Sequence, residues 1–251
     1  LIARTRLAIL LDTFRNKDKI NQDLLIDILL KVSEMICELP QIQAMDINPL
    51  IINDKEAVVV DARIMIKDAE ISKIPYGHMA ICPYPNHLIS TCTLKDGVKV
   101  GIRPISPEDV RLEQDFIQQL SSKSKYFRFM GNMQELSLKK LIRFTQIDYD
   151  REMALVATSK EIIIGIARYS TNPDFQTCEF AIVVADAWQG KGLGYQLMSH
   201  LIQIAQERGL KIMSGAIFPS NAGMLTLVKD LGFSIQIDQR DPRMQIASKL
   251  L

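Results

Sequence analysis

A glycine-rich hexapeptide, Gln189-Gly190-Lys191-Gly192-Leu193-Gly194, most narrows what this chain can fold into, because it joins a strand-like run to a helix-like run. Residues 180–185 before it are apolar, and from residue 193 to 205 apolar residues recur at helical spacing. Glycines let an anion approach the backbone closely, and the first turn of a helix adds unpaired N–H groups and a positive dipole end. The sequence therefore predicts a strand-to-helix turn that binds the diphosphate of a ligand.

The spacing of the glycines argues against two other phosphate-binding motifs. A dinucleotide fold needs G-x-G-x-x-G after its first strand and an acidic residue about 20 positions later. A P-loop needs Ser or Thr directly after Gly-Lys, whereas Lys191 is followed by Gly192. The pattern here is Q-x-x-G-x-G, deep in the chain and after a strand that carries Glu179.

The elements expected around this turn form a mixed α+β domain. Strands are predicted by alternating or continuous apolar runs at residues 98–103, 153–158, 161–169, 180–185, 211–217, 233–238 and 243–249. Helices are predicted after the capping candidate Ser106, near 137–147, from 193 to a C-terminal cap at Gly209, and from Asn221 to about residue 230.

The N-terminal part has a different organisation. An apolar stripe over residues 24–36 predicts an amphipathic helix that follows the capping candidate Asn21 and stops before Pro40. Two strand-like runs, 44–51 and 57–66, predict a hairpin. Prolines and a glycine in residues 75–85 disfavour regular structure. We therefore predict an N-terminal segment at 1–70, a linker at 71–95 and a second domain at 96–251.

Composition excludes several classes of function. The formal net charge is only +1, with no concentrated basic run, so we expect no nucleic-acid partner. No apolar run approaches the length of about 18 residues that crosses a bilayer, and the first residues lack a secretory pattern, so we expect a cytoplasmic protein without a membrane partner. The 4 cysteines are scattered without C-x-x-C spacing, which predicts neither a zinc site nor a disulfide framework.

The C-terminal domain resembles a known family. Q-x-x-G-x-G after a Glu-bearing strand, with Asn221 and Leu231-Gly232-Phe233 downstream, resembles the coenzyme A loop of GNAT-fold acyltransferases. Within that family the domain resembles the bacterial Pat-type protein lysine acetyltransferases through three phrases: Arg103-Pro104-Ile105, residues 145–154 and Cys178-Glu179-Phe180-Ala181. The resemblance implies a GNAT fold, which is a mixed, mostly antiparallel sheet flanked by helices. It also implies transfer of an acetyl group from acetyl-CoA to a lysine ε-amino group without a metal ion.

The N-terminal segment is similar to the tail of an ATP-grasp portion, through Asp46-Ile47-Asn48-Pro49-Leu50 and Asp61-Ala62-Arg63-Ile64. Pat-type enzymes join a synthetase-like region of this kind to their GNAT domain. The resemblance therefore implies a small α/β segment whose remaining synthetase-like region lies outside these residues, and acyl-CoA synthetases such as acetyl-CoA synthetase as protein substrates. Residues matching Asn48 and Asp61 hold magnesium in complete ATP-grasp ligases. With so few ligands present we expect a vestigial or split metal site and no ATP hydrolysis.

Glu179 is the candidate catalytic residue. A lysine with a pKa of about 10.4 is rarely neutral at pH 7, so the attacking amine needs a base. Glu179 is the only carboxylate between residues 175 and 185, and by resemblance it matches the family's catalytic glutamate. A glutamate that merely faces solvent from an edge strand is the structural alternative.

The resemblance also predicts the residues that bind the cofactor. Backbone N–H groups near Ile182, Val183 and Val184 would polarise the thioester carbonyl, at a place where the strand is expected to separate from its neighbour. The remaining candidates are Gln189, Gly190, Lys191, Gly192, Leu193, Gly194, Tyr195 and Asn221. Lys191 either contacts the ligand or is solvated, and Asn221 either contacts coenzyme A or caps its helix.

One departure from the family leaves other functions open. Many GNAT enzymes have a tyrosine four residues before the glycine of L-G-F, where it protonates the departing thiolate, and this sequence has Val228 there. A module that binds acyl-CoA without turning it over is therefore one alternative. A fragment of an ADP-forming acyl-CoA synthetase, suggested by the N-terminal segment, is the other.

Overall fold

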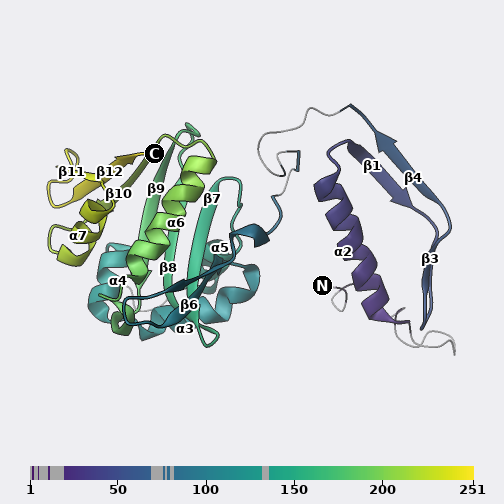
Figure 1. Ribbon diagram of the computed structural model, residues 1–251, viewed down its shortest axis with the longest axis horizontal. Coiled ribbons are helices and arrows are strands. Elements are labelled where there is room, and N and C mark those ends of the chain that lie inside the picture. The colour runs from purple at the N-terminus through teal and green to yellow at the C-terminus, as the bar shows by residue number, and fades with distance from the viewer. Residues whose placement is uncertain are drawn as a thin grey trace. The chain divides into compact units, whose positions relative to one another are not determined.

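The computed structural model describes residues 20–68, 82–131 and 136–251, together with the single residues 2, 5, 11, 76, 78 and 79. The chain divides into two compact units, Leu1–Ala80 and Ile81–Leu251. Figure 1 shows the elements of each unit, and each unit is described by itself.

The first unit contains one described long helix and two short antiparallel ladders. Helix α2 (Gln22–Glu38) begins after Asn21, whose side chain accepts a hydrogen bond from the Asp23 N–H. Asn21 is thus the N-cap that the sequence predicts. Strand β1 (Ile42–Ile47) pairs with β4 (Ala62–Ile66), and β2 (Leu50–Ile52) pairs with β3 (Ala57–Val59). The predicted hairpin is thus present, but Pro49, which has no N–H to donate, lies between its two ladders.

The apolar stripe of α2 is real but largely unshielded by the described residues. No residue of α2 is buried, and Leu29 keeps 52% of its surface exposed. In the part of the chain that the structure describes, no helix is both long enough and apolar enough to span a bilayer.

The second unit is built on one eight-stranded sheet with the order β11-β12-β10-β9-β8-β7-β6-β5. The strands are β5 (Ser90–Thr93), β6 (Lys99–Pro104), β7 (Glu152–Ser159), β8 (Ile162–Thr171), β9 (Thr177–Val184), β10 (Ile212–Ile217), β11 (Ser234–Ile237) and β12 (Gln245–Leu250). All neighbours are antiparallel except β9 and β10, which run parallel. The prediction of a mixed, mostly antiparallel sheet is confirmed.

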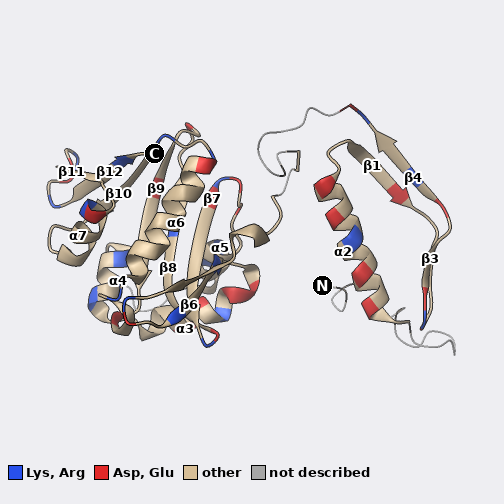
Figure 2. Ribbon diagram, in the orientation of Figure 1, with Lys and Arg blue, Asp and Glu red and all other residues tan. Residues whose placement is uncertain are grey.

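Helices cover both faces of the sheet (Figure 1). They are α3 (Val110–Gln119), α4 (Ser122–Phe129), α5 (Leu138–Thr145), α6 (Leu193–Glu207) and α7 (Ala222–Asp230). Strand β7 divides its side chains between two cores: Leu155 and Ala157 pack in the core under α6, whereas Ala154 and Val156 pack in the core under α3 and α5. This alternation is the period-2 pattern of a strand buried on both faces. Figure 2 shows the consequence, since charged residues lie mostly on helices and turns and are few in the central strands.

Two elements of this unit were not predicted. Helix α4 has the sequence SKSKYFRF, which lacks a clear apolar stripe, and only its cap Ser121, which accepts a hydrogen bond from the Ser124 N–H, signals it. Strand β5 lies inside the predicted linker and pairs with β6 from Ser90↔Ile102 to Thr93↔Lys99. The predicted linker therefore contributes a strand to the edge of the sheet.

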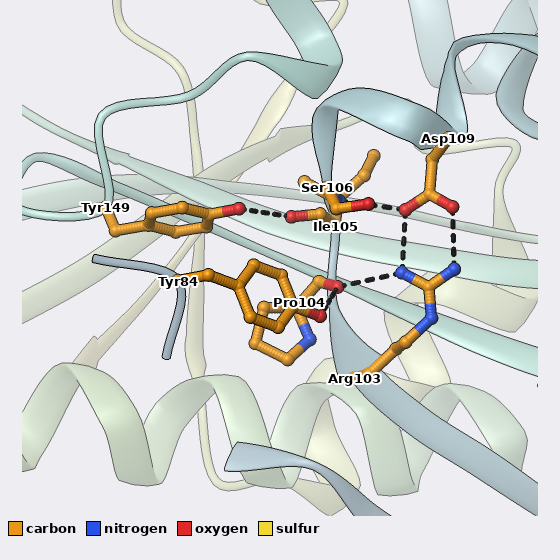
Figure 3. A network of polar contacts seen from close by, with 7 residues as sticks. All are labelled: Tyr84, Arg103, Pro104, Ile105, Ser106, Asp109 and Tyr149. Carbon is orange, nitrogen blue, oxygen red and sulfur yellow. Dashed lines mark hydrogen bonds and ion pairs between the residues drawn. The ribbon is translucent and has the colours of Figure 1, made fainter. Parts of the chain in front are cut away.

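A polar network connects the segment before β5, which contains Tyr84, to the end of β6 (Figure 3). The Tyr84 hydroxyl donates to the Pro104 carbonyl at 2.7 Å, and the Tyr149 hydroxyl donates to the Ile105 carbonyl at 2.5 Å. The two tyrosine rings meet edge to face with centroids 5.8 Å apart. Arg103 donates to both oxygens of the buried Asp109, at 2.7 and 2.6 Å, and this ion pair raises the pKa of the guanidinium. The phrase Arg103-Pro104-Ile105 is thus a structural joint between β6 and the short helix η3 (Pro107–Asp109).

Candidate active site

A cavity of about 1250 Å³ lies along the C-terminal half of β9. Its walls are formed by β9, the end of β10, the glycine turn (residues 189–194), α4 and the start of α7. This volume is somewhat above the usual range of about 300–1,000 Å³ for small-molecule and cofactor sites.

The cavity opens where β9 separates from β10. The parallel ladder runs only over Ile212↔Thr177, Met213↔Cys178 and Ser214↔Glu179. Beyond Glu179, β9 stays paired with β8 as far as Val184, while β10 continues along β12. The main-chain groups on the free edge of β9 are therefore available to a ligand, and Ile182, Val183 and Val184 line the cavity there.

Phe180 and Gly215 pack against each other at the point where the strands separate. A Cβ atom on Gly215 would lie 2.7 Å from two ring carbons of Phe180. The Phe180 ring is buried and packs edge to face against Phe233, at 5.3 Å between centroids. An aromatic ring of β9 thus lies against the bare backbone of β10, which leaves no room for a side chain at position 215.

Glu179 lies at the inner end of this opening. Its neighbours Cys178 and Phe180 are buried in the core under α6, and the Glu179 side chain is exposed and lines the cavity. Burial raises the pKa of the Cys178 thiol to about 12, so that residue stays a neutral thiol. Of the described carboxylates that line the cavity, Asp186 is engaged with α4 and Asp230 lies at the end of α7, which leaves Glu179 as the one on β9.

The glycine turn has the backbone that the sequence predicts for an anion cradle. Gly190 and Gly192 have φ angles of +74° and +89°, a region that disfavours side chains. A Cβ atom on Gly194 would lie 3.3 Å from Leu227 Cδ2, so this glycine permits close packing of α6 on α7. Helix α6 begins at Leu193, directly after the turn, and its first N–H groups have no partner within the helix. The turn therefore fits a diphosphate group on the evidence of its own geometry.

The flanking side chains of the turn are held by the protein. The Gln189 amide donates to the Val184 carbonyl at 3.0 Å and to Ser124 Oγ at 3.3 Å. Lys191 Nζ lies 3.1 Å from Asp96 Oδ2 and 5.0 Å from the centre of the Trp188 ring. Both residues line the cavity, and the Lys191 ammonium is paired there with Asp96.

Three other predicted cofactor-binding residues differ in which of their groups face the cavity. Tyr195 lines the cavity with 46% of its surface exposed. Asn221 lines it too, and its side chain accepts a hydrogen bond from the Met224 N–H at 3.2 Å, so it caps α7. The Leu193 side chain is 1% exposed and belongs to the core, so that only its main chain can face a ligand.

Helix α4 is the part of the site that the sequence did not reveal. Lys123, Ser124, Phe127 and Arg128 line the cavity from this helix. The carboxylate of Asp186 accepts hydrogen bonds from the Ser121 N–H at 2.9 Å and from the Ser121 and Ser124 hydroxyls at 2.7 Å each. Although partial burial opposes it, these hydrogen bonds hold the pKa of Asp186 below its usual value. The start of α4 is thereby fastened to the end of β9.

Three further residues named in the sequence analysis can be placed. Val228 has no ionisable group, and its side chain is fully buried on α7. In the first unit, the Asn48 N–H donates to the Asp61 carbonyl at 3.1 Å, and Asp61 Oδ2 lies 3.9 Å from Arg63 Nε. Within the described ranges no group of three or more His, Cys, Asp or Glu side chains is arranged to hold a metal ion.

Comparisons with known proteins agree with this architecture. The Acetyltransferase (GNAT) family matches residues 116–233, and an ATP-grasp domain family matches residues 1–66. An acetyltransferase of Pseudomonas aeruginosa is 39% identical over 154 residues, which span 60% of this chain and 81% of that protein. The acetyltransferase Pat of Mycolicibacterium smegmatis is 28% identical over 134 residues, 52% of this chain and 40% of that protein.

A solved structure shows the same fold. The GNAT domain of PAT from S. lividans superposes with a TM-score of 0.64 at 29% identity, covering 67% of this chain and all of that domain. This chain belongs to the GNAT family of acetyltransferases and carries an ATP-grasp-like segment before its acetyltransferase domain.

Proposed function

We propose that this protein transfers the acetyl group of acetyl-CoA to the ε-amino group of a lysine in target proteins, with acyl-CoA synthetases as the favoured target class. One observation carries the proposal: the opening between β9 and β10 begins at Glu179 and leads to the glycine turn. A coenzyme A thioester whose diphosphate lies at the glycine turn and whose acyl group lies in this opening would bring its acyl carbon to Glu179, the only carboxylate on β9.

In this proposal the chain binds the donor mainly through its backbone. The N–H groups from Gly190 to Gly194, at the positive end of the α6 dipole, hold the diphosphate. N–H groups on the free edge of β9, between Ile182 and Val184, accept the developing charge of the thioester oxygen. Such donors are preorganised because the strand remains fixed by its ladder with β8.

Glu179 acts as general base, directly or through one water. It takes a proton from the lysine ammonium, and the neutral amine that results attacks the thioester carbon and then loses its second proton to solvent. A C–N bond forms, the C–S bond breaks, and the coenzyme A thiolate leaves. Solvent supplies the thiolate proton, because Val228 cannot. A positioned base of this kind contributes typically about 10² to 10⁴ in rate.

The choice of a protein lysine as acceptor rests on the relatives. Two of the similar proteins are named Pat or PAT, and over 52 residues this chain is 40% identical to the beta subunit of an ADP-forming acetate–CoA ligase of Pyrococcus furiosus. The partners we propose are acetyl-CoA synthetase as substrate and the remainder of a synthetase-like region in the full-length protein. For Asn48 and Asp61 we propose a vestigial or split metal site.

The test is acetylation of a purified AMP-forming acetyl-CoA synthetase with acetyl-CoA. Glu179→Ala should lower kcat/KM at least about tenfold while the Kd for coenzyme A, measured by calorimetry, changes less than about twofold. Asp230→Ala, which removes a cavity carboxylate outside β9, is the matched control and should retain activity. Equal losses in both variants would contradict the role of Glu179.

A second candidate, an acyl-CoA sensor without turnover, is favoured by the buried Val228. Micromolar binding of acetyl-CoA, without an acetylated product on any lysine of a cell lysate by mass spectrometry, would support the sensor and overturn the transferase.

A further inference from the structure

Arg128 differs from the other arginines that are not fully exposed in the described part of the chain. Arg103 pairs with Asp109, Arg168 pairs with Glu113, and Arg208 donates to the Tyr169 hydroxyl. The Arg128 guanidinium has no hydrogen bond or ion pair with any described residue, although it is only partly exposed and lines the cavity.

Aromatic rings cover this guanidinium and leave its donors free. Its central carbon lies 5.1 Å from the centre of the Phe129 ring and 6.0 Å from that of Phe144. Rings attract a guanidinium through its charge but do not use its in-plane N–H groups, which match the two oxygens of a carboxylate. Burial, with the like charge of Arg168, lowers the pKa of Arg128 to about 10, so it remains a cation at pH 7.

Among the described residues the local charge is not balanced. Glu113 Oε1 lies 2.8 Å from Arg168 Nη2, whereas Glu113 Oε2 and Arg168 Nε are buried without a hydrogen-bond partner among the described residues. Two arginines thus share one carboxylate, which leaves a net positive charge beside the cavity. An unpaired cation in a partly dry site is costly, and an incoming anion would relieve that cost.

Arg128 lies toward the end of the cavity that contains Glu179, where the acceptor amine would bind. Ser124 and Arg128 are four residues apart and so share one face of α4, about 6 Å along its axis. Ser124 is fastened near the end of β9 through Asp186 and Gln189. The Arg128 guanidinium lies by contrast close to Phe144, whose ring also covers Arg168, the cross-strand partner of Ala181. Ala181 is two residues from Glu179 on the same face of β9, so the free cation and the proposed base face the same part of the cavity.

We propose that Arg128 forms an anion subsite for a carboxylate carried by the acceptor. In a protein substrate this carboxylate is an acidic side chain next to the target lysine, and in a small substrate it is the α-carboxylate of an amino acid. The inference rests on the proposed function for the acetyl transfer itself. It adds that the protein selects acceptor amines that carry a nearby carboxylate.

The experiment compares matched acceptors that differ only in a carboxylate. One arm uses peptides with a single lysine and Glu or Gln at each flanking position, and the other uses methionine and methionine amide. The wild-type protein should show a kcat/KM about five- to tenfold higher for the carboxylate member of at least one pair. In Arg128→Gln this ratio should fall to within about twofold of unity, and Arg128→Lys should keep part of it.

Lys125→Gln is the control, because it removes a cation from the same helix outside the cavity, and it should keep the wild-type ratio. The ratio is compared within each variant, and thermal unfolding verifies that each variant is folded, so a general loss of activity does not mimic the result. No carboxylate preference in the wild-type protein, or a preference unchanged in Arg128→Gln, overturns the inference. An Arg128-dependent preference for succinyl-CoA over acetyl-CoA would place the anion on the donor and overturn it as well.

The two proposals fail in different ways. If lysine peptides are acetylated without a preference for a flanking carboxylate, the proposed lysine acetyltransferase activity is supported and the proposed Arg128 subsite is rejected. Failure to acetylate any lysine peptide, with Arg128-dependent use of methionine, supports the subsite and overturns the lysine acceptor.

Discussion

Glu179 and Ser214 form the last residue pair between β9 and β10, and the sheet opens immediately beyond them. The backbone of Glu179 is therefore fixed by paired strands on both sides, through Ser170 of β8 and Ser214 of β10, while the next residues of β9 are free on one edge. A rigid position next to an open strand edge suits a general base better than a loop position does.

Gly215→Ala should strongly destabilise the acetyltransferase domain. The new methyl group would meet the Phe180 ring at 2.7 Å, between two buried strands, and neither can move freely. We expect a loss of about 1–3 kcal/mol in the free energy of unfolding, measured by urea denaturation. Gly223→Ala, where a Cβ atom meets nothing within 4 Å, is the control and should be nearly neutral. Equal stability of the two variants would contradict the packing of Phe180 on Gly215.

Gly192→Ala should separate the strain of the turn from its binding role. Gly192 at φ +89° and Gly209 at φ +77° both impose a left-handed backbone, so alanine at either position should cost about 1–2 kcal/mol of stability. At position 192 the methyl group would also lie 3.4 Å from Lys95 Cγ, at the cavity wall, whereas at position 209 it meets nothing within 4 Å. Only Gly192→Ala should weaken coenzyme A binding, about tenfold or more by calorimetry. A similar loss of affinity in Gly209→Ala would show that the effect comes from stability alone.

Asp186→Asn should loosen α4 in a pH-dependent manner. The folded-state pKa of Asp186 lies below the unfolded value of about 3.9, so its ionised form stabilises the fold above that value. This stabilisation is lost as the pH falls through the folded-state pKa. The difference in unfolding free energy between wild type and Asp186→Asn should thus be constant from pH 7 to about pH 5 and shrink below about pH 4. A difference that stays the same at pH 3 would argue against the charge-assisted bonds from Ser121 and Ser124.

Glu179→Gln should make catalysis depend on the ionisation of the acceptor. Without a base, the reaction needs an amine that is already neutral, and this fraction rises about tenfold per pH unit below the lysine pKa of about 10.4. The rate of the variant should therefore rise steeply between pH 7 and pH 9, and its deficit relative to the wild-type protein should narrow. Initial rates at several pH values measure this. A deficit that does not change with pH would point to a positioning role for Glu179 instead.

Local sequence patterns determined the elements that carry most of the site. The glycine spacing, the apolar strand before it and the helix after it predicted the turn at residues 189–194, because glycine conformations and helix ends are short-range properties. The period-2 alternation of a strand likewise places Glu179 on the opposite face from Cys178 and Phe180, and in the structure these two neighbours are buried while Glu179 is exposed. The same local signals predicted the capping of α2 by Asn21.

Only the tertiary structure decided how these elements meet. Phe180 packs against Gly215 of another strand at the point where β9 separates from β10, and Asp186 at the cavity wall accepts hydrogen bonds from residues of α4 and its cap that lie more than 60 positions earlier in the chain. The pairing of Lys191 with Asp96 and the isolation of Arg128 are long-range in the same sense. A sequence read residue by residue carries local backbone preference, whereas a partner, or the lack of one, is set by packing between segments that are distant along the chain.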